Sequence, residues 1–212
     1  MSDWKMNRRP ALVLLHMQKG IVGKGDFIPG RNDKASKAIK ESGMIERIQE
    51  LLKAFRDKKL PVVFVSTFPN PLGVVPAYGW LMRNIEDAKI DPDLLHSERT
   101  RDGLDIIPEM NRRPDEPILW NWLLGGFSNS GLDLVLKQRD VKTVVLAGFA
   151  AHSVVYITGV QACDHWYSVV IPRDASTSGP GPKDRQAYDA VMDVMFSAFS
   201  LVTTTNDVIA HL

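Results

Sequence analysis

The feature that most constrains the fold is a regular alternation of short apolar segments with amphipathic ones. The helical segment 35–58, for example, repeats apolar side chains such as Ile45, Ile48 and Leu52 at three- and four-residue intervals. Strands that are apolar on both faces and alternate with helices are typical of a parallel sheet covered on both sides. The strand candidates are Ala11–Met17, Pro61–Ser66, Pro117–Trp120, Thr143–Ala147, Ser168–Ile171 and, more weakly, Leu201–Thr203.

This alternation predicts an α/β fold: a three-layer α/β/α arrangement with a mostly parallel, roughly six-stranded Rossmann-like sheet. No internal repeat is visible, so we predict a single domain over residues 1–212. Residues 68–111 interrupt the rhythm with prolines and charges. We expect this excursion to form a lid or an oligomer contact, with a surface loop carrying one short helix as the alternative. The predicted helices are Ala35–Lys58, Leu132–Arg139, Ser153–His165 and Asp184–Phe199.

Composition limits the classes of partner. The 212 residues carry 26 basic and 25 acidic side chains, a net charge of +1, so no bulk attraction to nucleic acid or to an anionic membrane is expected. The single cysteine, Cys163, excludes an internal disulfide and a multi-cysteine metal site. No apolar run approaches the roughly 18 residues of a membrane helix, and Met1–Pro10 has no apolar signal core. We therefore expect a cytoplasmic protein.

Unusual residues follow three of the predicted strands. His16 comes near the end of the first strand, Asn121 follows the third, and residues 150–154 follow the fourth. Ligands of open α/β sheets bind beyond the carboxyl ends of the strands. If these strands are neighbours, the three features converge on one pocket. Flat apolar walls for that pocket are expected from Trp80, Trp120 and Trp122.

His16 interrupts an otherwise apolar strand, which requires a partner for its ring. One interpretation is an acid/base group or ligand contact that titrates near neutral pH. The alternative is a histidine hydrogen-bonded to the backbone or to Gln18. Asn121 has a similar alternative, because an asparagine can also close a turn. His152 is a candidate ligand contact at the start of the following helix.

The backbone of residues 150–154 is a further candidate, because free amides at a helix start form an anion or oxyanion site. Ser153 is a weaker candidate. It lies beside His152, but we expect it to cap the helix rather than to act as a nucleophile. No Gly-x-Ser-x-Gly elbow is present.

Four segments in order resemble one known family. They are ALVLLHMQKGIV, GLDIIPEMNRRPDEPILWNWLLGGFSNSGLDLVL, VKTVVLAGFAAHSVVYITGVQA and SVVIPRDAS. Together they resemble the isochorismatase-like family, or cysteine hydrolase superfamily, which includes nicotinamidases, carbamoylsarcosine amidohydrolases and isochorismatases. The resemblance runs from about Pro10 to His211. It implies hydrolysis of a small molecule and assembly as a homodimer or homotetramer.

The family's chemistry uses an aspartate, a lysine and a cysteine. The resemblance places these three roles at His16, Asn121 and Val154, so it implies a divergent member that lacks the triad. Cys163 lies nine residues after Val154, in the body of the next helix, and is not expected to substitute for the nucleophile. Gln18 does match the glutamine of the family's Asp-x-Gln element.

Further expectations follow from the resemblance. An oxyanion hole would comprise the amides of Ala151 and Val154, and a non-proline cis peptide would fall at Ala150–Ala151. No cofactor is implied. No metal is expected either, because Asp26 and His96 are not accompanied by a His-x-x-His pattern. The expected substrate contacts are Gln18, Trp80, Trp120, Trp122 and His152.

Two main functions remain open on the sequence. The first is a hydrolase-like enzyme that acts on a small, aromatic or carbonyl-containing molecule by cysteine-independent chemistry, with His16 as the acid/base group. The second is a catalytically dead relative that binds a small molecule or serves as an assembly subunit. A structural protein with no ligand is the weakest interpretation, since a crevice with tryptophans and free amides exceeds what a core needs.

Overall fold

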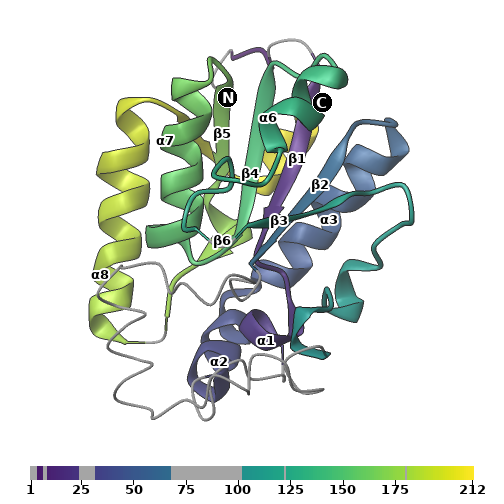
Figure 1. Cartoon of the computed structure of the whole chain (residues 1–212). Coiled ribbons are helices and arrows are strands. Elements are labelled where there is room, and N and C mark those ends of the chain that lie inside the picture. Colours follow the sequence, from purple (N-terminus) through teal and green to yellow (C-terminus); the bar gives the residue numbers. More distant parts are fainter. Residues whose placement is uncertain (1–3, 7–8, 24–31, 68–101, 122, 180) are drawn as a thin grey trace.

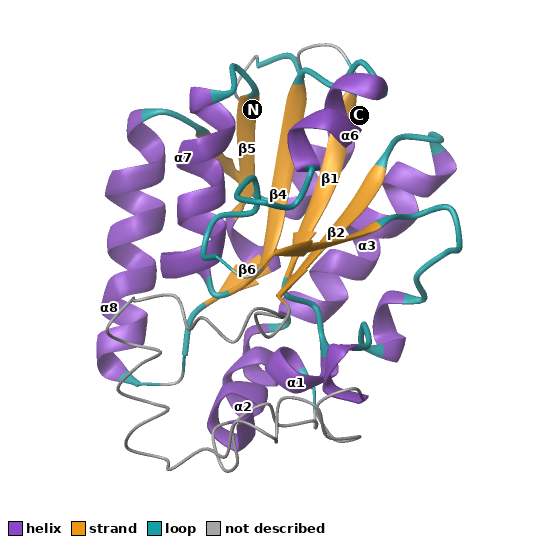
Figure 2. Ribbon diagram, in the orientation of Figure 1, coloured by secondary structure: helices purple, strands orange, loops and turns teal. Residues whose placement is uncertain are grey.

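A parallel sheet forms the centre of the computed structural model, which describes residues 4–6, 9–23, 32–67, 102–121, 123–179 and 181–212 (Figures 1 and 2). The strands run in the order β3-β2-β1-β4-β5-β7, and β6 pairs with β4, giving seven strands. Every described strand pair is parallel. The strands are β1 (Pro10–Leu15), β2 (Val62–Thr67), β3 (Ile118–Asn121), β4 (Thr143–Phe149), β5 (Ser168–Pro172), β6 (Ser176–Thr177) and β7 (Leu201–Thr203). The predicted α/β class is confirmed.

Helices cover both faces of the sheet, so the three-layer prediction is also confirmed (Figure 2). On one face lie α6 (Leu132–Gln138), the π-helical turn η3 (Ala151–Val155), α7 (Tyr156–Asp164), α8 (Pro182–Ala190), and η5 (Val191–Met195) with η6 (Phe196–Ala198). On the other lie α1 (Lys19–Val22), α2 (Asn32–Ser42), α3 (Met44–Asp57), η2 (Pro108–Met110), η4 (Arg173–Ala175) and α9 (Thr205–Ala210).

Strand alternation divides the core into two apolar clusters. Leu15 and Val65 face the α7 side, whereas Leu14 and Phe64 face the α3 side. All four side chains are fully buried. At roughly 1.5–3 kcal/mol for each fully buried large apolar side chain, both layers contribute substantially to holding the sheet in place.

Several expected elements have different bounds; the helix predicted over Asp184–Phe199, for instance, is α8 followed by η5 and η6. The single helix predicted over 35–58 is divided into α2 and α3, because Gly43 adopts a φ of 68° and interrupts the helical path. The first strand ends at Leu15 rather than at Met17, because His16 has a left-handed φ of 56°. The two-residue strand β6 was not predicted, since two residues are too few to show a pattern.

Gly148 allows β1 and β4 to approach closely at their carboxyl ends. It has a φ of 129°, and a Cβ atom there would lie 2.2 Å from the carbonyl oxygen of Leu15. An alanine would therefore meet both backbone strain and a backbone clash. This glycine fixes the spacing of the two strands from which the candidate site is built.

A buried ion pair joins α3 to the segment before β3. Arg56 donates through Nε and Nη2 to the Glu116 carboxylate at 2.6 and 2.8 Å. Arg56 also donates to the carbonyls of Met110 and Asn111, and the Arg113 amide donates to Glu116. The two charged side chains are only 11% and 6% exposed. Their hydrogen-bonding groups are thus extensively paired.

The excursion predicted at 68–111 is described only from residue 102 onward, so the lid or oligomer contact falls mostly outside the described residues. The segment 102–107 lies against the end of β1. The amide of Ile107 donates to the carbonyl of Met17, and Lys19 Nζ contacts Asp102 and Asp105 at 2.7 and 3.1 Å. No described helix is both long and apolar enough to cross a bilayer.

Candidate functional site

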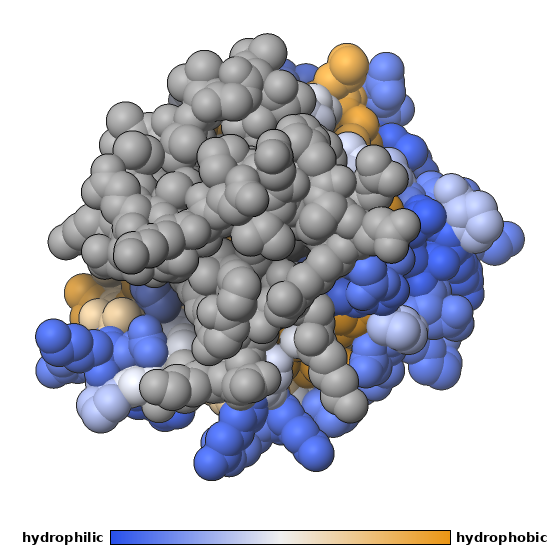
Figure 3. All heavy atoms as spheres, turned by 60° about the horizontal axis from the view of Figure 1, so that its bottom comes forward, coloured by the Kyte–Doolittle hydropathy of each residue, from blue (hydrophilic) through white to orange (hydrophobic). Residues whose placement is uncertain are grey.

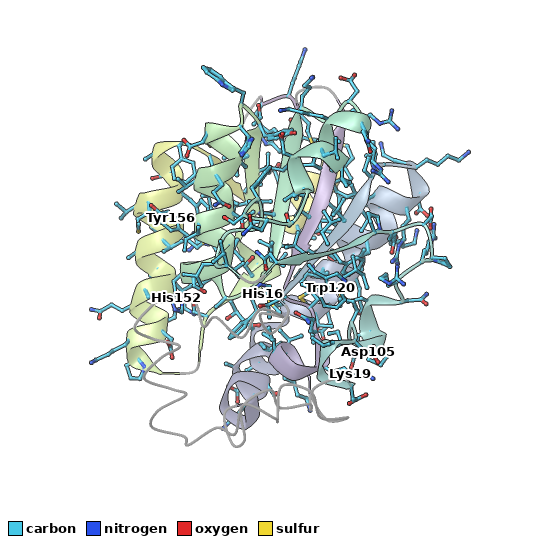
Figure 4. The ribbon with its side chains drawn as sticks, viewed as in Figure 1. His16, Lys19, Asp105, Trp120, His152 and Tyr156 are labelled. Atoms are coloured by element: carbon cyan, nitrogen blue, oxygen red, sulfur yellow. The ribbon has the colours of Figure 1, made fainter. Side chains whose placement is uncertain are left out.

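The strand order brings the predicted site residues to one edge of the sheet. β1 lies between β2 and β4, and β3 lies beyond β2. The His16 amide donates to the carbonyl of Val65 in β2, and Thr67 pairs in register with Asn121. Figure 4 shows His16 below the end of β1, with His152 on one side and Trp120 on the other. Figure 3 views this end of the molecule, where the visible described surface is largely hydrophilic with small apolar patches.

His16 carries a buried nitrogen, Nε2, that has no hydrogen-bond partner of good geometry. Burial lowers the pKa of His16 from 6.5 to about 4, and the nearby Asn121 side chain offsets part of this shift. The imidazole is therefore neutral at neutral pH. The ring can accept or donate one proton there but carries no charge.

Asn121 is 1% exposed and uses only half of its amide. Its Nδ2 donates to the carbonyl of Gly125 at 2.8 Å, whereas its Oδ1 is buried without a partner. The same loop is tied to the Val154 region, because Gly126 N donates to Thr158 Oγ1 and that hydroxyl donates to the carbonyl of Val154. Asn121 and Val154 are thus positioned by one connected set of hydrogen bonds.

Gln18 is fully buried, and its amide is fully engaged by backbone groups. Its Oε1 accepts from Thr67 N at 2.8 Å, and its Nε2 donates to the carbonyls of Thr67 and Leu104 at 3.0 and 3.3 Å. These bonds connect the end of β1, the end of β2 and the segment 102–107. Within the described structure, all three of these hydrogen bonds are to the protein backbone.

The π-helical turn η3 follows β4 and contains the predicted backbone donors. Ala151 and Val154 are buried there, and the carbonyl of Ala150 accepts from the amides of Ser153 and Val155. A helix leaves its first amides without intrahelical partners, which is what an oxyanion site requires. The non-proline cis peptide is Phe149–Ala150 and not Ala150–Ala151. The predicted position was therefore one residue late.

The remaining predicted contacts divide into described and undescribed residues. His152 Nδ1 lies 2.7 Å from Ser178 Oγ. Trp120 is 41% exposed at the end of the edge strand β3. Trp80 and Trp122 fall outside the described residues, as do Asp26 and His96.

Cys163 lies within α7, with its Sγ 3.6 Å from the carbonyl of Phe199. Burial raises the pKa of this thiol. A raised pKa disfavours the nucleophilic thiolate.

Two further residues emerge only from the structure. Ser66 and Ser176 are buried hydroxyl residues whose Oγ atoms have no partner within the described part of the chain. With His16 Nε2 and Asn121 Oδ1 they make four such atoms, and all four lie at the carboxyl ends of β1, β2 and β3 or in β6. Ser66 could have been noticed from the sequence, because it is a hydroxyl residue at the end of an otherwise apolar strand. Ser176 gave no such signal, because β6 was not predicted.

Known proteins resemble this chain over nearly its whole length. A ureidoacrylate amidohydrolase from Pseudomonas syringae pv. syringae is 26% identical over 206 residues, which cover 93% of this chain and 81% of the relative. An isochorismatase family protein from Burkholderia thailandensis is 25% identical and superposes with a TM-score of 0.74, covering 98% and 97% of the two chains. A cysteine hydrolase from P. syringae pv. phaseolicola is 23% identical with a TM-score of 0.76, covering 100% and 98%.

The family model described as the isochorismatase domain matches residues 10–207. That match spans the whole sheet, from β1 to β7, together with the strand ends described above. The chain belongs to the isochorismatase family of hydrolases.

Proposed function

We propose that this protein hydrolyses a small carbonyl compound, an amide in the first instance, without a cysteine nucleophile, and that His16 is the general base. One observation carries the proposal: the buried Nε2 of His16 and the nearby Asn121 Oδ1 make no hydrogen bond of good geometry with the described residues. Buried polar atoms are almost always hydrogen-bonded, so two adjacent exceptions are what a ligand site offers before its ligand arrives. The ureidoacrylate amidohydrolase named above supports the choice of an amide.

The chemistry uses groups at the strand ends. Neutral His16 accepts a proton from a water molecule as the water oxygen attacks the substrate carbonyl carbon. The amides of Ala151 and Val154 donate to the resulting oxyanion. Collapse of the intermediate breaks the bond to the leaving group, which takes the proton from the His16 imidazolium. Asn121 Oδ1 positions the reaction by accepting from the water or from a substrate N–H.

The proposal assigns no catalytic role to Cys163. Its thiol contacts the carbonyl of Phe199, and the resemblance puts the apolar Val154 where a nucleophile would stand. We therefore propose that the Asp-Lys-Cys triad is absent and that a water molecule supplies the nucleophile. Among the described site residues, His16 is the side chain suited to activating it.

A second candidate function is binding without turnover, as expected for a catalytically dead relative. The lowered pKa of His16 favours it, because a histidine with a pKa of about 4 is a weaker proton acceptor than an ordinary one. The same site would then hold a small neutral carbonyl compound through the unpartnered atoms of His16 and Asn121.

The test compares wild type, His16→Ala and His165→Gln with a panel of small amides, ureides and esters. His165 is a matched control, because its ring is partly exposed and stacks on Phe127. We expect turnover by wild type and His165→Gln, and a loss of about 10²–10⁴-fold in His16→Ala. Circular dichroism checks that each variant is folded.

Equal turnover in His16→Ala would refute the general-base role. Panel members that bind the wild type but are recovered unchanged would establish the second candidate instead. Because the two functions share the site, binding should weaken in His16→Ala in that case as well.

A further inference from the structure

A pocket lies at the β6 end of the sheet, and neither His16 nor Asn121 is among its described lining residues. It has a volume of about 80 Å³ and lies between β6, η4 and α8. Its lining includes Arg173, Arg185 and Asp174, together with three consecutive hydroxyl residues, Ser176, Thr177 and Ser178. The proposed hydrolytic function uses none of these six residues.

Among the described residues of this lining, the cations outnumber the anions. Arg173 Nη2 contacts Asp193 at 3.0 Å and Arg185 Nε contacts Asp189 at 3.3 Å, but a guanidinium has five N–H donors, so each retains others. Asp174, the acidic residue of the lining, already accepts two bonds through Oδ1 from the amide and hydroxyl of Thr205. The lining thus offers more donors than acceptors.

A buried and unpartnered hydroxyl points to a missing ligand. Ser176 is 3% exposed and its Oγ has no hydrogen-bond partner, although the residue lines the pocket. Leaving a buried polar group unpaired costs free energy, which a bound acceptor would recover. The Ser176 hydroxyl is a feature separate from the two arginines, and it too indicates a ligand that accepts hydrogen bonds.

We infer that the pocket binds a small oxyanion, a carboxylate or a phosphate group. Guanidinium groups match the planar, paired oxygens of such anions, and the hydrogen bonds are strengthened by charge. The Ser176 hydroxyl donates to one of the anion's oxygens. The inference does not rest on the proposed hydrolysis, since it concerns binding by residues outside that mechanism.

The pocket is also connected to the helix that carries the oxyanion donors. Ser178 lines the pocket, and its Oγ lies 2.7 Å from His152 Nδ1, whose backbone belongs to η3. An anion that takes a hydrogen bond from Ser178 changes the hydrogen bond between Ser178 Oγ and His152 Nδ1. Occupancy of the pocket is therefore expected to alter the ring signals of His152.

The experiment titrates the full chain with inorganic phosphate and, separately, with acetate, at low ionic strength in chloride buffer. Calorimetry measures affinity, and NMR follows the His152 ring. The variants are Arg185→Gln and Ser176→Ala. The matched control is Arg47→Gln, since Arg47 is also a surface arginine paired with an acidic neighbour, Glu50. Thermal melts confirm that all variants are folded.

We expect saturable binding of at least one anion, weakened about tenfold by Arg185→Gln and about threefold by Ser176→Ala, and unchanged by Arg47→Gln. Binding of both anions supports general oxyanion recognition, and binding of one alone identifies whether phosphate or carboxylate is the natural group. Absence of binding, or equal weakening by Arg47→Gln, would overturn the inference. If His16→Ala loses hydrolysis but still binds the anion, the inference is supported, because the anion pocket then functions independently of His16.

Discussion

Two pairs of polar side chains in this molecule differ in how completely their atoms are hydrogen-bonded. The Arg56–Glu116 pair is surrounded by hydrogen-bond partners from α3 and the segment before β3. In the His16–Asn121 pair, by contrast, one atom of each side chain is buried without a hydrogen-bond partner of good geometry among the described residues. Satisfied groups hold a fold together, whereas unsatisfied ones are retained at a cost that a ligand offsets.

The largest expected effect comes from breaking the satisfied pair. Glu116→Ala leaves the Arg56 charge buried without its carboxylate, so we expect a loss of about 3–5 kcal/mol in the free energy of unfolding. Urea denaturation measures it. The exposed pair Lys53–Asp57 provides the control, and Lys53→Gln should cost less than about 1 kcal/mol. Equal losses in the two variants would show that burial of the pair contributes nothing.

His16 should make the free energy of unfolding depend on pH. The pKa of His16 falls from 6.5 to about 4 on folding, so between these values the unfolded chain binds more protons than the folded one. Stability is then present in full above pH 6.5 and is lost as pH falls toward 4, at up to about 1.4 kcal/mol per pH unit and about 3 kcal/mol in all.

Comparison with His16→Leu isolates this contribution, because leucine does not titrate. Denaturation at a series of pH values should give a shallower dependence for the variant between pH 4 and 6.5. Parallel curves would mean that His16 titrates alike in the folded and unfolded states. Leucine also removes the unpartnered nitrogen, so the variant should equal or exceed the wild type in stability at pH 7.

A smaller loss of stability is expected from Thr158, whose hydrogen-bonded hydroxyl holds the loop that follows Asn121. Thr158 links the Asn121 loop to Val154, so Thr158→Val leaves Gly126 N and the carbonyl of Val154 without this partner. We expect a loss of about 1–3 kcal/mol and reduced turnover from a displaced Asn121. Ser197→Ala, at an exposed hydroxyl on η6, is the control and should change stability by less than about 0.5 kcal/mol. Unchanged turnover in Thr158→Val would show that Asn121 is positioned by its own strand alone.

The sequence was sufficient for features that depend on local periodicity. Apolar runs located six of the strands to within two residues at each end, and the parallel topology then placed His16, Asn121 and residues 150–154 at one edge. The break at Gly43 could have been predicted, since glycine after a helical turn is a common helix end. Its omission was an error of interpretation.

Features that depend on distant partners were not predictable. Arg56 and Glu116 are 60 positions apart, and Gln18 bonds to residues 49 and 86 positions away. Neither set has a signature in the residues around it. The unpartnered state of Ser66 and Ser176 is a property of the folded neighbourhood rather than of either residue.

The hydrogen bond from Thr67 N to Gln18 Oε1 has a consequence for how opening of the site can be observed. The Thr67 amide is held by a side chain that also holds the carbonyl of Leu104, so its protection from solvent depends on the segment 102–107 staying in place. Neighbouring amides of β2 are protected by the sheet itself. If the Thr67 amide takes up deuterium faster than its neighbours in β2, the segment 102–107 must move away from the strand ends without unfolding of the sheet. The exchange rate at Thr67 would then measure how often this part of the site, next to the buried Ser66, opens.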